Sequence, residues 1–238
     1  MKYKRVLLKL SGEALKQEEN GILDTAYLKE VALTVKKLHD NGVQVAIVIG
    51  AGNIWRGKLA KDIGIDHAKA DYMGMMGTVI NAAALSAMLE TISVPSVVYS
   101  AINAPSEISV PYSQEDALKS LEENKVIFLA GGTGKPFFTT DTASTLRAIE
   151  LNIDAILMGK NGVEGVYDSD PNKNKDAKFI KTITFEEIIK LNLQVMDITA
   201  VQLLLDKNIE IRVFSMSQLD NFLKVVEGED IGTTCKRG

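Results

Sequence analysis

Three loops, each directly after an apolar run, hold the residues best suited to binding phosphate. They are Lys9–Gly12, the Gly50–Gly52 turn with Arg56 behind it, and Gly131–Asp141. An unpaired ammonium at the end of an apolar strand is costly, and small residues let backbone N–H groups approach an anion. A guanidinium suits bidentate phosphate contact. The combination predicts a phosphate site, although Lys9 could instead extend its amine to solvent at a strand edge and the glycines could serve only as turns.

The glycine-rich sequence GGTGKPFFTTD does not match either common nucleotide motif. A P-loop would need glycine where Leu129 stands and a hydroxyl residue where Pro136 stands. A dinucleotide fingerprint would need glycine at Phe137, and the second loop fails the same pattern at Trp55. Phosphate binding is therefore expected without a P-loop, and a nicotinamide or flavin cofactor is not expected.

The third loop is also rich in hydroxyl groups and ends on a carboxylate. Thr133, Thr139 and Thr140 supply the hydroxyls, and Asp141 supplies the carboxylate. An alternative interpretation is structural, because Thr140 or Asp141 could cap the helix that follows. Both roles are compatible, since a helix N-terminus also attracts anions.

Two further acidic residues and several large apolar residues allow structural as well as functional interpretations. Asp71, near the start of a helix, complements the helix dipole, and Asp197 could be the N-cap of a later helix. The methionines of 73–76 are expected in the core. Phe137 and Phe138 are also expected in the core, with one of them facing a ligand.

The composition narrows the class of protein. The chain has 238 residues, of which 46% are hydrophobic, with 31 acidic against 27 basic residues and no dense basic run. No electrostatic feature indicates nucleic acid or a membrane surface as a partner. A single cysteine, Cys235, excludes an internal disulfide framework, and the separated His39 and His67 offer no zinc cluster. A reducing cytoplasm fits best, and we expect neither a signal peptide nor an apolar stretch of about 20 residues that spans a bilayer.

Buried-type strands alternate with helical segments along the chain. Such alternation predicts a three-layer αβα sandwich around a mainly parallel sheet, with ligands at the carboxyl ends of the strands. No repeat or linker interrupts it, so residues 1–238 are expected to form one domain, and Gly159–Lys175 is expected to be an exposed, turn-rich loop with a short hairpin. The expected strands are Arg5–Leu10, Val43–Ile49, Ser96–Tyr99, Val126–Ala130, Ala155–Met158 and Glu210–Phe214. The expected helices are Thr25–Asn41, Asp66–Ile92, Gln114–Glu123, Thr142–Leu151, Thr184–Leu191, Asp197–Lys207 and Leu219–Val226.

Four segments together resemble the bacterial uridylate kinases of the amino-acid kinase superfamily. They are Lys9–Gly12, Gly50–Arg56, Asp71–Met75 and Thr133–Asp141, and the resemblance spans nearly the whole chain. Its most specific part is the run Pro-Phe-Phe-Thr-Thr-Asp. The resemblance implies the amino-acid kinase fold and transfer of phosphoryl from ATP to UMP, with Mg²⁺ accompanying ATP.

The resemblance also assigns residues to roles. It implies four catalytic residues: Lys9, Arg56, Asp141 and Asp197. Lys9 would stabilise the transferred group, and Asp141 and Asp197 would orient the lysine or Mg²⁺. The residues expected at ATP are Lys9, Leu10, Ser11, Gly12, Gly52 and Arg56 for the phosphates and Asn161, Tyr167 and Asp170 for the nucleoside. The residues expected at UMP are Ala51, Asp71, Thr133, Gly134, Lys135, Pro136, Phe137, Phe138, Thr139 and Thr140.

Two positions depart from the family pattern, which usually has glycine at Ala51 and asparagine at Lys135. Ala51 is acceptable if its φ stays negative and it contributes only backbone. By resemblance the protein is a cytoplasmic homohexamer, activated by GTP and inhibited by UTP. The segment expected to mediate GTP activation comprises Gln17, Glu18, Glu19, Asn20, Gly21 and Ile22.

The residue types agree with such chemistry. A phosphate monoester has a second pKa of about 6, so UMP arrives largely as a dianion and needs no general base. The barrier is charge repulsion, which cations and backbone donors relieve, so Lys9 and Arg56 are expected to matter most. Two alternatives remain: a related kinase acting on a carboxylate or carbamate such as aspartate or glutamate, and a non-catalytic nucleotide sensor.

Overall fold

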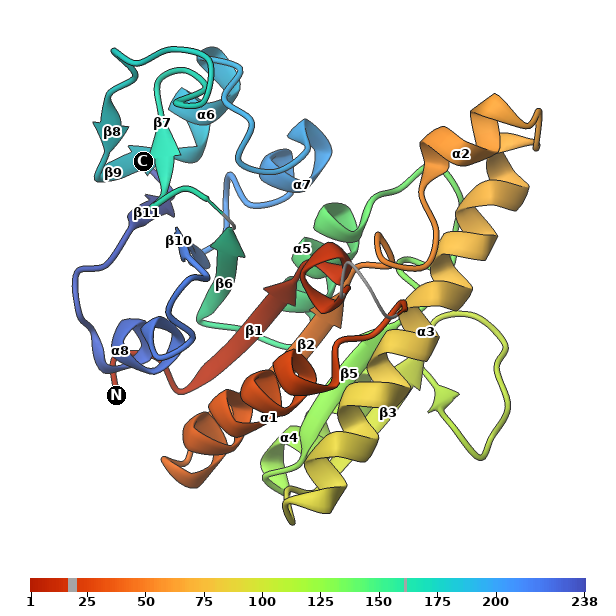
Figure 1. The fold of residues 1–238 in the computed structure, drawn as a ribbon. Coiled ribbons are helices and arrows are strands. Elements are labelled where there is room, and N and C mark those ends of the chain that lie inside the picture. The colour runs from red at the N-terminus through yellow and green to blue at the C-terminus, as the bar shows by residue number, and fades with distance from the viewer. Residues whose placement is uncertain (17–20, 161) are drawn as a thin grey trace.

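A computed structural model of the chain describes residues 1–16, 21–160 and 162–238. Within these residues, nine strands form one sheet in the order β4-β3-β5-β2-β1-β6-β10-β11-β9 (Figure 1). Every pairing described in this sheet is parallel except β10 with β11. The strands are β1 Arg5–Leu10, β2 Gln44–Ile49, β3 Ser96–Ser100, β4 Val110–Pro111, β5 Val126–Ala130, β6 Ala155–Lys160, β9 Thr182–Thr184, β10 Glu210–Ser215 and β11 Thr233–Lys236.

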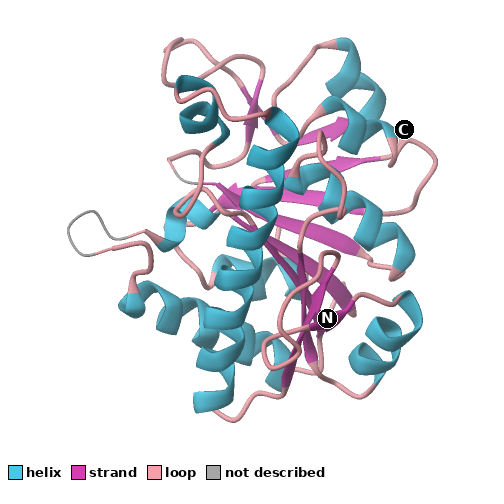
Figure 2. Ribbon diagram, turned by 90° about the vertical axis from the view of Figure 1, so that its right-hand side faces the viewer, coloured by secondary structure: helices cyan, strands magenta, loops and turns pink. Residues whose placement is uncertain are grey.

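Helices cover both faces of the sheet, as the view in Figure 2 shows. Successive side chains of a strand point to opposite faces, and β1 illustrates this. Val6, Leu8 and Leu10 join the core beneath α1, α3 and α8, whereas Leu7 joins the core beneath α4, α5, α6 and α7. The helices are α1 Thr25–Asp40, α2 Gly57–Asp62, α3 His67–Thr91, α4 Gln114–Glu122, α5 Thr140–Glu150, α6 Phe185–Lys190, α7 Ile198–Gln202 and α8 Asn221–Glu227. The predicted three-layer αβα fold is confirmed.

The six predicted strands are present: β1 and β5 have the predicted ends, and the other four differ at one end by one or two residues. The sequence reasoning missed β4, β9 and β11, because strands of two to four residues carry too little periodicity to be recognised. The turn-rich segment contributes only β7, Val166–Tyr167, to its hairpin. The partner strand β8, Phe179–Ile180, lies beyond the predicted end of that segment.

The seven predicted helices are present with ends that differ by at most two residues, except that α7 ends five residues early, and α2 was not predicted. α5 begins at Thr140 instead of Thr142, because the Thr139 side chain accepts hydrogen bonds from the N–H groups of Asp141 and Thr142. The expectation that Thr140 or Asp141 caps this helix is therefore wrong. α7 begins after its predicted N-cap, Asp197, but its α-helical part ends at Gln202.

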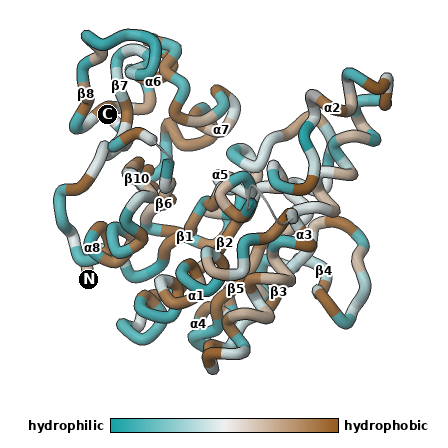
Figure 3. Tube along the Cα trace, viewed as in Figure 1, coloured by the Kyte–Doolittle hydropathy of each residue, from teal (hydrophilic) through white to brown (hydrophobic). Residues whose placement is uncertain are grey.

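The long helix α3 carries many apolar residues along its length, drawn in brown shades in Figure 3. Contrary to expectation, its length and composition would suffice to cross a membrane, but half of its most apolar window is buried inside the protein. It packs against β3 and β5 and is a core helix. Met75 is buried, whereas Met73 and Met76 are exposed, so the expectation of a core role is wrong for these two. The sheet covers only one side of the helix.

The direction of chain winding reverses at the centre of the sheet. From β1 the chain builds β2, β3 and β5 on one side, and it then crosses to β6 on the other side of β1. Lys9 of β1 is in register with Met158 of β6, so the carboxyl ends of these strands lie together. Ligands of doubly wound sheets bind at such a reversal.

Candidate active site

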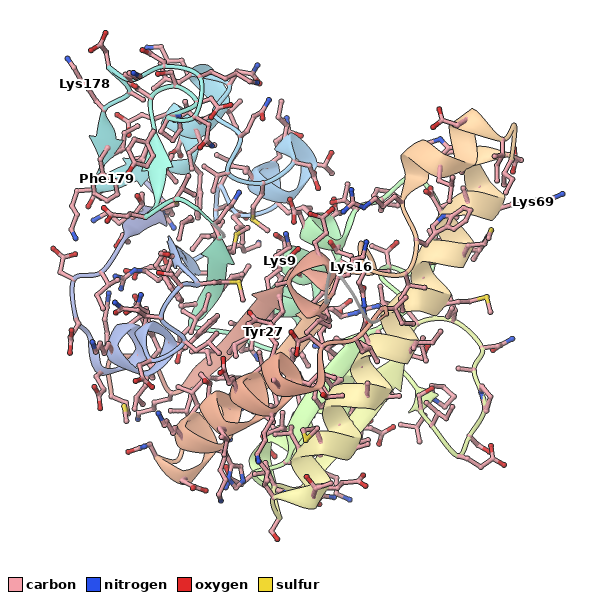
Figure 4. The ribbon with its side chains drawn as sticks, viewed as in Figure 1. Lys9, Lys16, Tyr27, Lys69, Lys178 and Phe179 are labelled. Atoms are coloured by element: carbon pink, nitrogen blue, oxygen red, sulfur yellow. The ribbon has the colours of Figure 1, made fainter. Side chains whose placement is uncertain are left out.

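Lys9 lies at the carboxyl end of β1, at the reversal point, and is labelled in Figure 4. Because side chains alternate along the strand, Lys9 lies on the α5 side, the side that Leu7 also faces. Its Nζ forms an ion pair with Asp141 in the first turn of α5, and the two side chains are 20% and 19% exposed. The alternative that Lys9 extends into solvent is therefore wrong.

A hydrogen-bond network fixes Asp141 and Asp197 beside this lysine. The backbone N–H of Asp197 donates to Asp141 Oδ2 at 3.2 Å. The Asp197 carboxylate caps α7 through the Ala200 N–H at 2.8 Å and accepts hydrogen bonds from the hydroxyls of Thr139 and Thr142. Burial alone would raise the pKa of Asp197, but the hydrogen bonds from Thr139, Ala200 and Thr142 outweigh it and lower that pKa.

A second lysine, Lys160, was missed by the sequence reasoning. It ends β6, and its Nζ donates to the carbonyl of Val195 at 3.0 Å. Burial, and then the positive charge of Lys9, lowers the pKa of Lys160. A signal was available, since the run AILMGK places a lysine at the end of an apolar strand just as RVLLKL does.

A cavity of about 470 Å³ opens on the β6 side of these lysines. We call it the donor cavity. Lys160 and Val195 lie at its inner end, and Tyr167 and Asp170 line it as expected. The pKa of Asp170 is lowered, chiefly by the hydrogen bond from the backbone of Asn172. The third residue expected here, Asn161, lies outside the described residues.

A smaller cavity, of about 190 Å³, opens on the β2 side and is called the acceptor cavity here. Five of the residues predicted at UMP line it, together with Gly52, which was predicted at ATP, and several that were not predicted. The five are Ala51, Asp71, Phe138, Thr139 and Thr140, and the residues that were not predicted include Trp55, Gly74, Met75, Thr78 and Gly132. Thr139 lines this cavity, and its hydroxyl donates a hydrogen bond to Asp197. Thr139 therefore lies between the cavity and the lysines.

Asp71 connects helix α3 to the Gly131–Asp141 loop. Its Oδ2 accepts the backbone N–H of Phe137 at 2.7 Å. Phe137 has a φ of +72°, which is rare for a bulky residue. This turn directs the rings of Phe137 and Phe138 outward, leaving them 67% and 50% exposed. The expectation of a core position is wrong for both, and Phe138 lines the acceptor cavity instead.

Several other predicted residues are not among those described around the two cavities. Arg56 forms an ion pair with Glu13 at 3.1 Å, and its Nε donates to the carbonyl of Gly52 at 3.2 Å. Thr133 lines a separate cavity, together with Arg147. Gly134, Lys135 and Pro136 are not among the residues described around the acceptor cavity, and Lys135 is exposed.

The start of the chain brings its own loop to the same end of the sheet. Ser11 and Gly12 follow β1, and Gly12 packs so closely on Gly50 that a Cβ there would collide with the Gly50 carbonyl oxygen. Of the expected GTP segment, Gln17, Glu18, Glu19 and Asn20 lie outside the described residues. Ile22 accepts a hydrogen bond from the Asn53 side chain at 2.7 Å.

Comparison with known proteins gives consistent matches. The model of the amino acid kinase family matches residues 4–215. A uridylate kinase of Limosilactobacillus reuteri is 49% identical over 234 residues, covering 98% of this chain and 97% of that protein. A uridylate kinase of Pediococcus pentosaceus is 46% identical over 236 residues, with coverages of 99% and 98%.

Solved structures agree with the sequence matches. The UMP kinase of Bacillus anthracis superposes with a TM-score of 0.95 at 38% identity, covering 98% of this chain and 96% of that one. The UMP kinase of Ureaplasma parvum gives a TM-score of 0.93 at 39% identity, with both chains fully covered.

Proposed function

The chain belongs to the amino acid kinase family, and from this premise we propose that it is a uridylate kinase. It transfers the γ-phosphoryl group of ATP to UMP, which yields ADP and UDP for pyrimidine nucleotide synthesis. The geometric support is the pair of cavities that flank Lys9, Lys160, Asp141 and Asp197 at the reversal point of the sheet.

We propose that the donor cavity holds ATP. Tyr167 and Asp170 would contact its nucleoside, together with Asn161. The phosphates would extend toward the backbone of Leu10, Ser11, Gly12 and Gly52, where small residues leave N–H groups accessible. Arg56 would reach them by leaving Glu13, since both side chains of that pair are more than half exposed and the pair is weak.

The acceptor cavity would hold UMP. Asp71 is placed to accept a hydrogen bond from a ribose hydroxyl. The UMP phosphate would lie near Thr139 and Thr140, which line the cavity, and the Thr139 hydroxyl is held by Asp197. Ala51 would contribute its backbone, and its φ is not among the positive ones described. Thr133, Gly134, Lys135, Pro136 and Phe137 would act as the rest of the same loop.

The reaction needs positioning and charge more than proton transfer. A UMP phosphate with a second pKa of about 6 is already nucleophilic at neutral pH. Lys9 would stabilise the charge on the transferred phosphoryl group, and Lys160 would do the same from β6. Asp141 would hold the Lys9 ammonium toward the transferred phosphoryl group, and Asp197 would hold Asp141 and Thr139 in place.

The carboxylates of Asp141 and Asp197 fit a role in orienting other side chains, because each already pairs with or accepts hydrogen bonds from neighbouring residues. Asp141 pairs with Lys9, and Asp197 accepts hydrogen bonds from Thr139, Thr142 and Ala200. The described residues include no cluster of three or more metal-ligating side chains. We propose that Mg²⁺ enters bound to the phosphates of ATP, where it neutralises their charge, with Asp141 and Asp197 as the nearest carboxylates.

The finer properties are also proposals. We infer a cytoplasmic homohexamer that acts as one domain over residues 1–238, with GTP as activator and UTP as inhibitor. Ile22 supports a link between the expected GTP segment and the site, because its carbonyl accepts a hydrogen bond from Asn53 of the Gly50–Arg56 loop. Sedimentation with and without each nucleotide tests the assembly, and initial rates with UMP, with and without GTP, test the activation.

A substrate panel tests the reaction itself. ADP release should be measured with UMP, CMP, aspartate, glutamate and carbamate as acceptors, each with MgATP. We expect rapid turnover with UMP alone. Turnover of an amino acid without turnover of UMP would contradict the proposal, and binding of UMP without any turnover would indicate a nucleotide sensor.

A further inference from the structure

One face of α3 is fitted to the loop that follows β2. Gly74 lies against Trp55, and Gly77 lies against Ala51. One turn further, Asn81 exchanges two side-chain hydrogen bonds with Asn53, at 2.8 and 2.9 Å, and donates to the carbonyl of Gly50 at 2.8 Å. Spacings of three and four residues place all three α3 residues on one side of the helix.

Gly77 is the unusual member of this face. Glycine inside a helix costs about 1 kcal/mol relative to alanine, so its position needs a reason. A Cβ at Gly77 would lie 2.8 Å from the Ala51 Cβ and 3.5 Å from the Ile54 Cβ. Carbon atoms in good contact lie about 3.5–4.0 Å apart, so an alanine here would force the loop and the helix apart.

Gly74 provides a contrast on the same helix. A Cβ there would approach the Trp55 Cδ1 at 3.7 Å, which is an ordinary contact. The requirement for glycine is thus specific to position 77. Its cause is the methyl group of Ala51, the residue at which the family usually has glycine.

We propose that Gly77 is a positioning residue for the acceptor nucleotide, one that accommodates the Ala51 methyl group and so sets the width of the acceptor cavity. The proposal rests on the proposed function. Ala51, Gly52 and Trp55 of the loop line that cavity, and so do Asp71, Gly74 and Thr78 of α3. Gly77 itself is buried and is not among the residues that line it.

The contact should affect binding of UMP more than binding of ATP. Asp71 precedes Gly77 by six residues, about 9 Å along the helix, and its carboxylate holds the Phe137 N–H. A displaced α3 would therefore move both Asp71 and the loop that closes the cavity. The residues described around the donor cavity belong to other elements. Of the residues proposed at ATP, only Gly52 and Arg56 lie on the loop that follows β2, so ATP binding should depend on the contact less than UMP binding does.

The chain offers a direct probe, because Trp55 is its only tryptophan and it lines the acceptor cavity. Dissociation constants for UMP should be measured by tryptophan fluorescence for the wild type, Gly77→Ala, Ala51→Gly and the double variant. Overpacking of this kind is expected to weaken UMP binding about tenfold in Gly77→Ala. The double variant removes the colliding methyl group, so its UMP affinity should return to within about threefold of the wild type. The KM for ATP should change less than the dissociation constant for UMP in Gly77→Ala.

Gly74→Ala serves as the control for helix propensity, with urea unfolding as its readout. It should stabilise the protein, whereas Gly77→Ala should not. Unchanged UMP affinity in Gly77→Ala, or a double variant no better than Gly77→Ala, would overturn the proposal. If Gly77→Ala does not fold, the double variant decides: normal UMP binding supports the proposal, and failure to fold or bind overturns it. A wild type that binds UMP without turnover would contradict the proposed function and leave this test of the cavity intact.

Discussion

Replacing Lys9 with methionine separates its catalytic role from its structural one. Methionine retains the apolar stem and removes the ammonium that pairs with Asp141. If Lys9 stabilises the transferred phosphoryl group, kcat should fall about 10²–10³-fold, the usual effect of removing one charge-stabilising donor. UMP affinity should change less than about threefold, because Lys9 is not among the residues lining the acceptor cavity.

The same substitution should also destabilise the protein. Exposed ion pairs contribute about 0–1 kcal/mol, whereas breaking a fully buried pair costs about 3–5 kcal/mol. The Lys9 and Asp141 side chains are 20% and 19% exposed, so the free energy of unfolding should fall by about 1–3 kcal/mol. The cost arises mainly from the carboxylate that is left without its cation.

A second substitution distinguishes the two effects. Asp141→Asn in the Lys9→Met background removes the isolated charge, and its Oδ1 can still accept the N–H of Asp197. Urea unfolding should show stability restored toward the wild type, while steady-state kinetics should show kcat still low. A Lys9→Met enzyme with kcat within threefold of the wild type would refute the proposed role of Lys9.

Three further predictions follow from other residues. Lys160→Met should lower kcat. Burial, and then the charge of Lys9, lowers the pKa of Lys160 in the folded state. Between this lowered pKa and the ordinary value of about 10.4, the unfolded chain binds more protons than the folded one, so the stability of the wild type rises with pH. Urea unfolding across that pH window should show a smaller rise in the Lys160→Met variant. Thr139→Val should cost about 1 kcal/mol of stability, because α5 loses its N-cap. It should also raise the pKa of Asp197 by removing a hydrogen bond, which would appear as loss of activity at a higher pH on the acid side of the rate profile. Burial raises the pKa of Cys235 to about 12, so at pH 8 a thiol reagent should modify it only in denaturant; modification of the native enzyme at the rate of a free thiol would contradict this assignment.

The sequence alone determined the architecture and the positions of the loops that we propose to bind phosphate. Unalternated apolar strands separated by amphipathic helices allow few arrangements other than a parallel sheet covered on both faces. Because the carboxyl ends of parallel strands meet at one edge, the placement of Lys9 and Gly50 directly after such strands already indicated a shared site.

Only the tertiary structure decided which of these residues touch. Lys160 lies 151 positions after Lys9, and no local pattern could reveal that β6 pairs with β1 instead of with β5. The outward turn of Phe137 depends on a carboxylate from α3, which is distant in sequence. In the same way, the glycine at position 77 is explained only by a methyl group on a loop before it. Local periodicity encodes elements, whereas contacts between elements arise from packing that the sequence does not display locally.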